Sequence, residues 1–143
     1  KRLINLQTKS VGDIVPKGQV IESVNINDSI LDLQDKLVSG CHKRLVVTKT
    51  HNNHEYPIGI LMFSAIAKAN VLHLNNIING ITDASVPTIA EVMNPCVVTL
   101  TETSAEVLVD KLDKGNHIVV AVDNEGIMKG IMQSDDIIHA LTA

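Results

Sequence analysis

The sequence predicts an α/β (α+β) fold in which one β-α-β-β-α unit occurs twice along 143 residues. Two observations lead to this prediction. Segment 10–15 returns as segment 88–93, and each copy continues with a β-rich stretch and then with apolar residues at helical spacing. Both helical patterns run into a glycine, Gly40 or Gly115, as helices often do at their C-termini. We therefore expect two repeats packed as a pseudo-twofold pair.

The strands are predicted where apolar runs are bounded by polar turn residues. Their order implies that each repeat contains a parallel crossover followed by an antiparallel hairpin. The turn of the second hairpin, residues 123–126, is short and has typical turn chemistry, whereas the first, residues 49–56, is longer and polar. The predicted strands are residues 20–26, 44–48 and 58–62 in the first copy and residues 96–100, 118–122 and 127–132 in the second.

Helix starts are predicted from capping-box pairs, Ser29 with Asp32 in the first copy and Thr103 with Glu106 in the second. A second helix closes each copy, at about residues 64–70 and 134–141. The domain organisation that follows is a first repeat at 8–70, a connector at 71–86 and a second repeat at 87–143. Because the connector is rich in Leu and Ile, we expect it to pack on the core.

Composition narrows the class of protein. Hydrophobic residues make up 45% of the chain and charged residues 20%, as in a globular domain. One Tyr, one Phe, no Trp and a net charge of −4 argue against a nucleic-acid partner, which would need aromatic platforms or a basic surface. No apolar run approaches the about 18 residues of a membrane span, so we expect no membrane contact by this segment itself, although a parent protein could be membrane-bound.

The two cysteines, Cys41 and Cys96, stand far apart and form no disulfide framework. No signal peptide is visible, so the sequence favours a cytoplasmic location.

The closing segment of each copy resembles a known family. Residues 130–136 read Gly-Ile-Met-Gln-Ser-Asp-Asp, which is similar to the Gly-apolar-apolar-Thr-x-x-Asp motif of the CBS domain, and residues 59–65 read Gly-Ile-Leu-Met-Phe-Ser-Ala. Upstream, residues 115–126 and 40–47 resemble the middle strand of the same family. The resemblance covers residues 8–143 and implies a tandem CBS pair, or Bateman module. The second copy also resembles the module of CorC-type magnesium/cobalt-efflux proteins.

The resemblance implies a ligand containing adenosine (AMP, ADP, ATP or S-adenosylmethionine, with or without Mg²⁺) in a cleft between the repeats. Asp136 occupies the family's ribose-binding position, and its carboxylate could accept from both hydroxyls. The helix that starts near Ser134 would offer its N–H groups to phosphate, and Gln133 could donate as well. The residues implied to surround the adenine are Val97, Val98, Val119 and Val120.

Several of these residues also have ordinary structural interpretations. Asp136 could be only a first-turn acid that the helix dipole favours, and Ser134 could be only an N-cap. His42 and Lys43 either reach the phosphates from the neighbouring repeat or form a solvated strand end.

The first copy departs from the family motif. Met62 replaces the Thr and Ala65 replaces the ribose-binding Asp, so we expect one competent site per chain.

Catalysis and metal binding find no support in the sequence. His51, His54 and Glu55 share a polar loop, but the spacing lacks the helical geometry of a zinc enzyme and favours a solvated turn. His117 is expected to face the cleft or a dimer surface.

We therefore predict a regulatory ligand sensor without enzymatic activity that controls an attached or partner effector. The alternative is a dimerisation module that has lost its ligand. In either case a homodimer is expected, formed by apolar side chains on the closing helix and near the repeat starts. These are Ile137, Ile138 and Leu141, with Ile14 and Val92.

Overall fold

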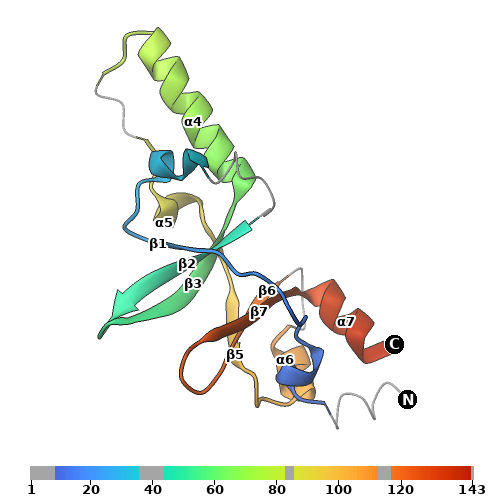
Figure 1. The fold of residues 1–143 in the computed structure, drawn as a ribbon. Coiled ribbons are helices and arrows are strands. Elements are labelled where there is room, and N and C mark those ends of the chain that lie inside the picture. Colours follow the sequence, from blue (N-terminus) through green and yellow to red (C-terminus); the bar gives the residue numbers. More distant parts are fainter. Residues whose placement is uncertain (1–8, 36–43, 83–85, 113–116, 143) are drawn as a thin grey trace.

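The computed structural model describes residues 9–35, 44–82, 86–112 and 117–142. Its strands form two sheets, one of four strands and one of three, which lie in different halves of the molecule (Figure 1). Mixed α/β architecture and two successive sheets confirm the predicted fold class.

The first sheet contains the strands of the first repeat. β1 (Ser23–Asn25) runs parallel to β2 (Arg44–His51), and β2 pairs antiparallel with β3 (His54–Met62). The fourth strand, β4 (Asn94–Pro95), comes from a distant part of the chain and pairs antiparallel with β3.

The second sheet repeats the plan of the first. β5 (Val97–Leu100) runs parallel to β6 (Ile118–Val122), and β6 pairs antiparallel with β7 (Met128–Gln133). Both hairpins carry a register irregularity at the same point of the strand, between Val47 and Thr48 in one and between Ala121 and Val122 in the other. The shared irregularity aligns β2 with β6 residue by residue, so Val46 corresponds to Val120.

In the described ranges six helical elements accompany the sheets, and the two longest are α4 and α7. α4 (Phe63–Ile78) extends away from the sheets at one end of the molecule, and α7 (Ser134–Thr142) lies at the other end (Figure 1). The shorter elements are α2 (Val11–Ile14), the 3₁₀ helix η1 (Ile30–Leu33), α5 (Ile89–Val92) and α6 (Ala105–Lys111).

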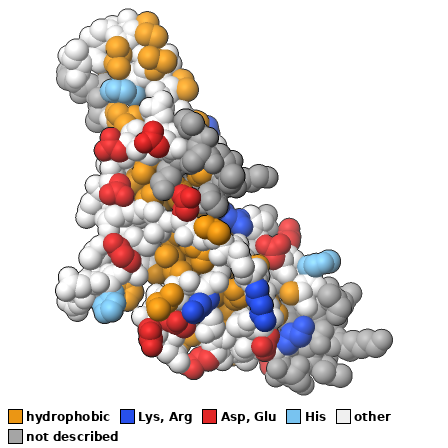
Figure 2. Space-filling model, viewed as in Figure 1, with side chains coloured by type: hydrophobic (Ala, Val, Ile, Leu, Met, Phe, Trp, Pro, Cys, Tyr) orange, Lys and Arg blue, Asp and Glu red, His pale blue; other side chains and the backbone are white. Residues whose placement is uncertain are grey.

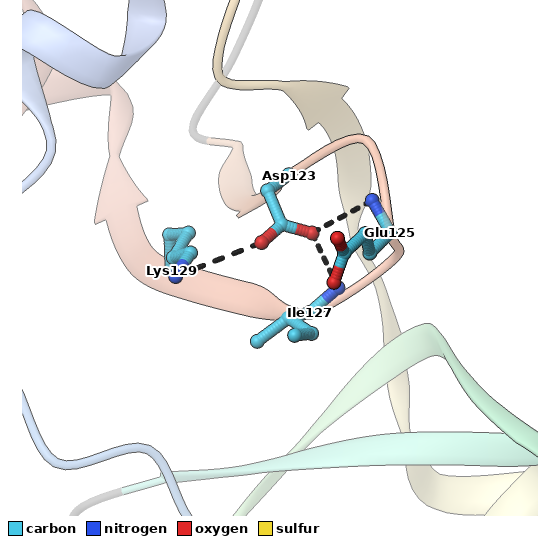
Figure 3. A network of polar contacts seen from close by, with 4 residues as sticks. All are labelled: Asp123, Glu125, Ile127 and Lys129. Carbon is cyan, nitrogen blue, oxygen red and sulfur yellow. Dashed lines mark hydrogen bonds and ion pairs between the residues drawn. The ribbon is translucent and has the colours of Figure 1, made fainter.

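The two hairpin turns differ in chemistry. Asn52 and Asn53 both have positive φ (50° and 64°), which makes the turn between β2 and β3 a two-residue turn of the type that favours Asn. In the turn between β6 and β7 the Asp123 carboxylate accepts from the N–H groups of Glu125 and Ile127, each at 2.9 Å (Figure 3). The N–H of Ile127 is the largest cause of the lowered pKa of Asp123, and Lys129, 3.6 Å away, adds to it.

The first helices of the two repeats are exchanged between the two cores. Val11 and Ile14 of α2 pack in the core of the second repeat with Leu108, Val119 and Ile137. The same segment is hydrogen-bonded to the loop before α6: the N–H groups of residues 11 and 12 donate to the carbonyls of residues 103 and 101, both at 2.8 Å.

In the other direction, Ile89 of α5 is buried in the core of the first repeat with Leu45 and Ile66. Each repeat therefore completes the core of the other (Figure 1).

Two glycines mark the places where the exchanged segments cross the sheets. A Cβ on Gly59 would lie 2.8 Å from Sδ of Met93 and 2.9 Å from the carbonyl oxygen of Asn94. A Cβ on Gly130, at the equivalent position of β7, would overlap Cγ1 of Val15. Both positions are crowded because the other repeat's segment passes so close that a Cβ would meet the Val15 side chain at Gly130, and the Met93 side chain and the Asn94 carbonyl at Gly59.

A third apolar cluster joins the two sheets. Val46 and Ile60 of the first sheet and Val120, Val122 and Ile131 of the second are buried together. The two repeats thus share one packed interface, across which a change in one sheet reaches the other.

The structure differs from the sequence predictions at several boundaries. α4 continues to Ile78, through the first half of the predicted connector. That stretch does not pack on the core, because Leu74, Ile77 and Ile78 are exposed.

Helix starts and one strand also differ. The N-cap of α6 is Ser104, whose hydroxyl accepts from Val107 N–H at 3.3 Å, rather than Thr103. Ser29 caps η1 through its backbone position alone, without a side-chain bond. β3 begins at His54 rather than at residue 58, and Pro57 lies within it opposite Thr48, at the register irregularity, where the missing N–H is tolerated.

The predicted dimer surface is largely internal. Ile137 is 1% exposed and Ile14 only 9%, both within the second core, while Val92 packs against the first. Ile138 is exposed, and the side chain of Leu141 lies outside the described residues. The apolar face of α7 therefore serves the core of its own chain.

Candidate functional site

A cavity of about 410 Å³ lies between the two sheets beside the start of α7. Asn94 and Pro95 of β4, which belongs to the first sheet, form one wall. His117, Ile118 and Gln133 of the second sheet form the other. Ile118 and Gln133 are register partners at the open end of the β6–β7 hairpin, so their position follows directly from strand pairing. The cavity therefore lies between the two sheets, although all five described lining residues come from the second repeat.

Asp136 lies in the first turn of α7, three residues after Gln133, which lines this cavity; Asp136 itself is not among the described lining residues. Its Oδ2 accepts a hydrogen bond from the backbone N–H of Gln133 at 3.0 Å. This is the acidic half of a capping arrangement, which holds the carboxylate close to the end of β7. A carboxylate has about four acceptor sites, so Asp136 keeps capacity for further donors after this bond. The cap and the ligand interpretations of Asp136 are therefore compatible.

Ser134 has a structural role that the sequence analysis did not foresee. Its hydroxyl accepts from the N–H of His117 at 2.9 Å and donates to the carbonyl of the same residue at 3.2 Å. The N–H of Ser134 donates to that carbonyl as well, at 3.0 Å. Ser134 is 9% exposed and ties the start of α7 to the start of β6. Its hydroxyl is therefore engaged with the backbone of His117, and Ser134 is not among the described lining residues of the cavity.

The four valines implied to surround an adenine are dispersed by strand alternation. Val119 is fully buried in the second core, and Val120 is fully buried between the sheets. Val97 is half-buried against the second core, and Val98 lines a different cavity, at the Leu100 end of β5. These valines are absent from the described lining of the cavity that contains Gln133.

The apolar lining of that cavity comes instead from Pro95 and Ile118. The sequence analysis missed both, together with Asn94. These residues lie at the cavity because of a contact between distant parts of the chain. β4 pairs with β3 only because segment 93–96 crosses to the other repeat, and a sequence pattern does not show such a crossing.

The equivalent region of the first repeat is built differently. Met62 is the register partner of Arg44, as Gln133 is of Ile118, and three residues later Ala65 stands where α7 has Asp136. A second cavity of about 410 Å³ lies there, lined among others by Met62, Ala65 and Lys68. Neither cavity has a carboxylate among its described lining residues, so the two differ in the residue next to them, Asp136 in one and Ala65 in the other.

His42 and Lys43, the other candidate ligand residues, lie outside the described residues. His51 and His54 face each other across the tip of the β2–β3 hairpin, and both rings approach Tyr56 with centroids 6.4 Å away. In the described part of the chain, no three His, Cys, Asp or Glu side chains are grouped so that they could hold a metal ion. Burial raises the pKa of the Cys96 thiol, which disfavours the reactive thiolate.

Comparison with known proteins identifies the class. The sequence model of the CBS domain family matches residues 89–143. No curated protein sequence matches the chain.

Solved structures are similar over nearly the whole chain. A hemolysin-like protein containing a CBS domain from Oenococcus oeni is 14% identical, with a TM-score of 0.65 over 99% of this chain and 96% of that one. The CBS domain of a bacterial CNNM/CorC family Mg²⁺ transporter in complex with ATP is 16% identical, with a TM-score of 0.62 over 99% and 92%. A CBS-domain pair with bound AMP from Klebsiella pneumoniae is 18% identical, with a TM-score of 0.57 over 95% and 100%.

The architecture defined by two exchanged repeats is that of a tandem CBS-domain pair. Residues 89–143 match the CBS domain family model, and the chain as a whole has the fold of the pair. Within the described residues, no helix has both the length and the apolar character needed to cross a bilayer.

Proposed function

We propose that the chain is a regulatory module without catalytic activity that binds an adenosine-containing ligand in the cavity between the two sheets, beside α7. The observation that carries the proposal is the convergence at this cavity of β4, the start of β6 and the end of β7. Solved structures of the same fold contain AMP or ATP, which supports an adenosine nucleotide as the ligand class.

The residues around the cavity divide the ligand into parts. Asp136, held beside the cavity by its bond to Gln133, accepts from the ribose hydroxyls. Pro95 and Ile118 provide apolar surface for the base. The backbone N–H groups of the first turn of α7 that follow Ser134, whose own N–H donates to His117, and the side chain of Gln133 face a phosphate or carboxylate group of the ligand.

Only one of the two sites is competent in this proposal. Ala65 offers no acceptor for ribose hydroxyls, and the thioether of Met62 is no donor to phosphate. His42 and Lys43 remain candidates for contacting the phosphates.

Ligand binding between the sheets would be transmitted through the apolar cluster that joins them, which includes Val46, Ile60 and Val120. Regulation requires that the ligand bind one arrangement of the two sheets more tightly than another, because only such a difference in affinity shifts the equilibrium between them. We propose that the effector is attached or neighbouring, that the module is cytoplasmic and homodimeric, and that a transporter of the CNNM/CorC kind is the leading candidate for the effector.

A ligand panel tests this function. Melting temperatures are measured with AMP, ADP, ATP and S-adenosylmethionine at millimolar concentration, with and without Mg²⁺, and positive results are followed by calorimetric titration. A ligand that binds only the native state raises the melting temperature, because it adds to the free energy of unfolding. At a hundredfold excess of ligand over Kd the added free energy is about 2.7 kcal/mol. One ligand equivalent per chain is expected.

The second candidate function is a dimerisation module without a ligand. The replacement of the family's Thr by Gln133 and Met62, and the absence of an acid at Ala65, favour it. Unchanged melting temperatures across the panel, together with a stable dimer, would decide for this alternative.

A further inference from the structure

The cavity at the start of α4 is lined by residues of both repeats. Its volume is about 410 Å³, the same as that of the cavity beside α7. One part of the lining is Ala65, Lys68, Ala69 and Leu72 of α4, whose spacing of three, four and seven positions places them on one face of the helix. The exchanged helix α5 of the second repeat adds Val92. The exchange of helices therefore completes a cavity that neither repeat forms alone.

The apolar part of this lining is aliphatic. Met62 and Pro87 add hydrocarbon surface to the α4 face, and the described lining contains no aromatic ring on which a planar base could stack. Leu72 is 42% exposed, so part of the aliphatic surface meets solvent. Covering such a surface is favourable in proportion to the apolar area removed from water, and the flexible Met side chain adapts to an alkyl chain. The lining thus favours an aliphatic ligand.

A single positive charge accompanies this aliphatic surface. Lys68 is the only Lys or Arg between residues 50 and 110. On the face drawn in Figure 2, most Lys and Arg side chains lie over the half of the molecule that holds the second repeat, whereas acidic side chains extend toward α4. Within the described ranges Lys68 forms no ion pair. The charge of Lys68 is therefore available to an anion.

The nearby polar groups also favour an anion. Ser64 and Asn94 line the cavity, and a hydroxyl and an amide can both donate to a carboxylate. Glu91 precedes Val92 in the chain, but its carboxylate accepts from the backbone N–H of Thr88 at 3.3 Å and from the Thr88 hydroxyl at 3.0 Å. With no carboxylate in the described lining, ribose hydroxyls lack their acceptor here, whereas a ligand carboxylate meets no repulsion.

We propose that the cavity at the start of α4 is a second ligand site, which binds a small aliphatic carboxylate. The alkyl chain lies against Ala65, Leu72 and Val92, and the carboxylate pairs with Lys68. The proposal goes beyond the adenosine ligand of the proposed function and does not depend on it. The Ala65 replacement is then a change of ligand class in the first repeat. One exposed charge pair and a short buried chain give roughly millimolar affinity.

The first test compares ligands of one length and opposite charge. Amide chemical shifts of the isotope-labelled full chain are recorded during titration with octanoate and, separately, with octylammonium. Octanoate should bind more tightly and shift the amides of Ala65, Lys68 and Leu72. Hexanoate should bind more weakly than octanoate, by about threefold to fourfold for each methylene group removed, because each buried methylene group adds to the binding free energy.

The second test reverses the charge at the site. Lys68→Glu should weaken octanoate binding about tenfold, since it removes an attraction and adds a repulsion, and octylammonium should become the tighter ligand. Lys49→Glu is the matched control, with the same change of charge at a position outside the described lining of the cavity, and it should bind octanoate like the wild type. Both lysines are exposed, so the fold should persist, which unchanged circular dichroism verifies.

Four results would each overturn the proposal. These are no saturable shifts up to roughly 20 mM octanoate, shifts at Gln133 and Asp136 instead of α4, octanoate affinity unaffected by Lys68→Glu, and equal weakening by Lys49→Glu. AMP titrations of the same variants keep this proposal separate from the proposed function. Because Lys68 is not among the described lining residues of the cavity beside α7, a failure of AMP to bind concerns the adenosine site alone.

Discussion

The two repeats share a backbone plan and differ at their closing helices. The strand register, the irregularity in each hairpin and the crossing glycines Gly59 and Gly130 are common to both. By contrast, α4 has 16 residues and α7 nine, and Ala65 stands where the second repeat has Asp136. The features that both repeats keep are those that pack the shared core. The features that differ face a cavity or solvent, where each repeat is free to take a separate role.

The comparison also teaches that neither repeat is a self-sufficient unit. α2 of the first repeat packs in the second core, and α5 of the second repeat packs in the first. The core under each sheet is therefore built partly from residues of the other repeat. Each of the following substitutions tests one side of this pairing against the other.

The largest effect is expected from removing the exchanged side chains. Ile89 is completely buried in the core of the first repeat, so Ile89→Ala should lower the free energy of unfolding by about 2–5 kcal/mol. Val11→Ala, in the other core, should cost less because a smaller side chain is removed. Urea unfolding gives the free energies, and hydrogen exchange gives their location.

Location is the discriminating readout. Ile89→Ala should accelerate exchange chiefly in β2 and β3, and Val11→Ala chiefly in β6 and β7. The reverse pattern, with each substitution loosening the strands of its own repeat, would contradict the exchange of helices.

A somewhat smaller loss is expected at the crossing points. Gly59→Ala and Gly130→Ala each introduce a methyl group into contact with the passing segment, which should cost about 1–3 kcal/mol. The two sites differ in the atoms that the new methyl group would contact. The nearest atoms to Gly130 belong to the Val15 side chain, whereas Gly59 also faces the backbone carbonyl of Asn94.

Rescue by a second substitution separates the two crossings. Val15→Ala should restore much of the stability lost in Gly130→Ala, because it removes the atoms that overlap. Met93→Ala should restore little in Gly59→Ala, because the Asn94 carbonyl remains 2.9 Å from the new Cβ. Equal rescue at both sites, in double-mutant unfolding cycles, would show that the crossings are equivalent after all.

The difference between Asp136 and Ala65 leads to a binding prediction. Asp136→Ala removes the acceptor of two ribose hydroxyls and should weaken adenosine-ligand binding at least about tenfold in calorimetric titration. The structure adds a cost that the sequence did not indicate: the bond from the N–H of Gln133 is lost too, which should lower stability by about 1 kcal/mol.

Two controls divide these effects. Asp136→Asn keeps an oxygen that can accept from Gln133 but loses the charge, so it should weaken binding while retaining most of the stability. Asp135→Ala changes the neighbouring acid of the same turn and should bind like the wild type. If Asp135→Ala and Asp136→Ala weaken binding equally, the assignment of the ribose position is wrong.

The sequence was sufficient for the repeats because local patterns determine them. Residues 118–122 were predicted as a strand and form β6 with the same bounds. The first hairpin was predicted too, but its long polar turn at 49–56 is wrong: residues 49–51 and 54–56 extend β2 and β3, and the turn is only Asn52 and Asn53. The end of α4 was missed since Asn75, Asn76 and Asn79 are poor helix formers and suggest a loop. Tertiary anchoring at Ile66 and the cap at Gly80 override that preference.

The site was only partly predictable for a different reason. The register of a hairpin places Gln133 beside Ile118, and a helix start places Asp136 one turn later, both of which are local facts. Which face of β6 each valine presents, and that Pro95 forms the opposite wall, depend on how the repeats exchange segments. Contacts between segments that are far apart in the sequence produce no periodic pattern of apolar residues from which they could be predicted.

The smallest effect expected is a gain in stability, at a position where the second repeat is worse packed than the first. Thr99 is 4% exposed, and its hydroxyl has no hydrogen-bond partner among the described residues. The equivalent position of β1 is Val24, which pairs with Val47 as Thr99 pairs with Ala121. A buried hydroxyl without a partner loses its hydrogen bonds to water on folding and forms none within the protein. Thr99→Val should therefore raise the free energy of unfolding by about 1 kcal/mol. The matched control is Thr48→Val, because Thr48 is equally buried but its hydroxyl donates to the carbonyl of Val24 at 3.3 Å. Urea midpoints at constant slope should rise for Thr99→Val and stay or fall for Thr48→Val, whereas a lower midpoint for Thr99→Val would mean that its hydroxyl is satisfied in solution.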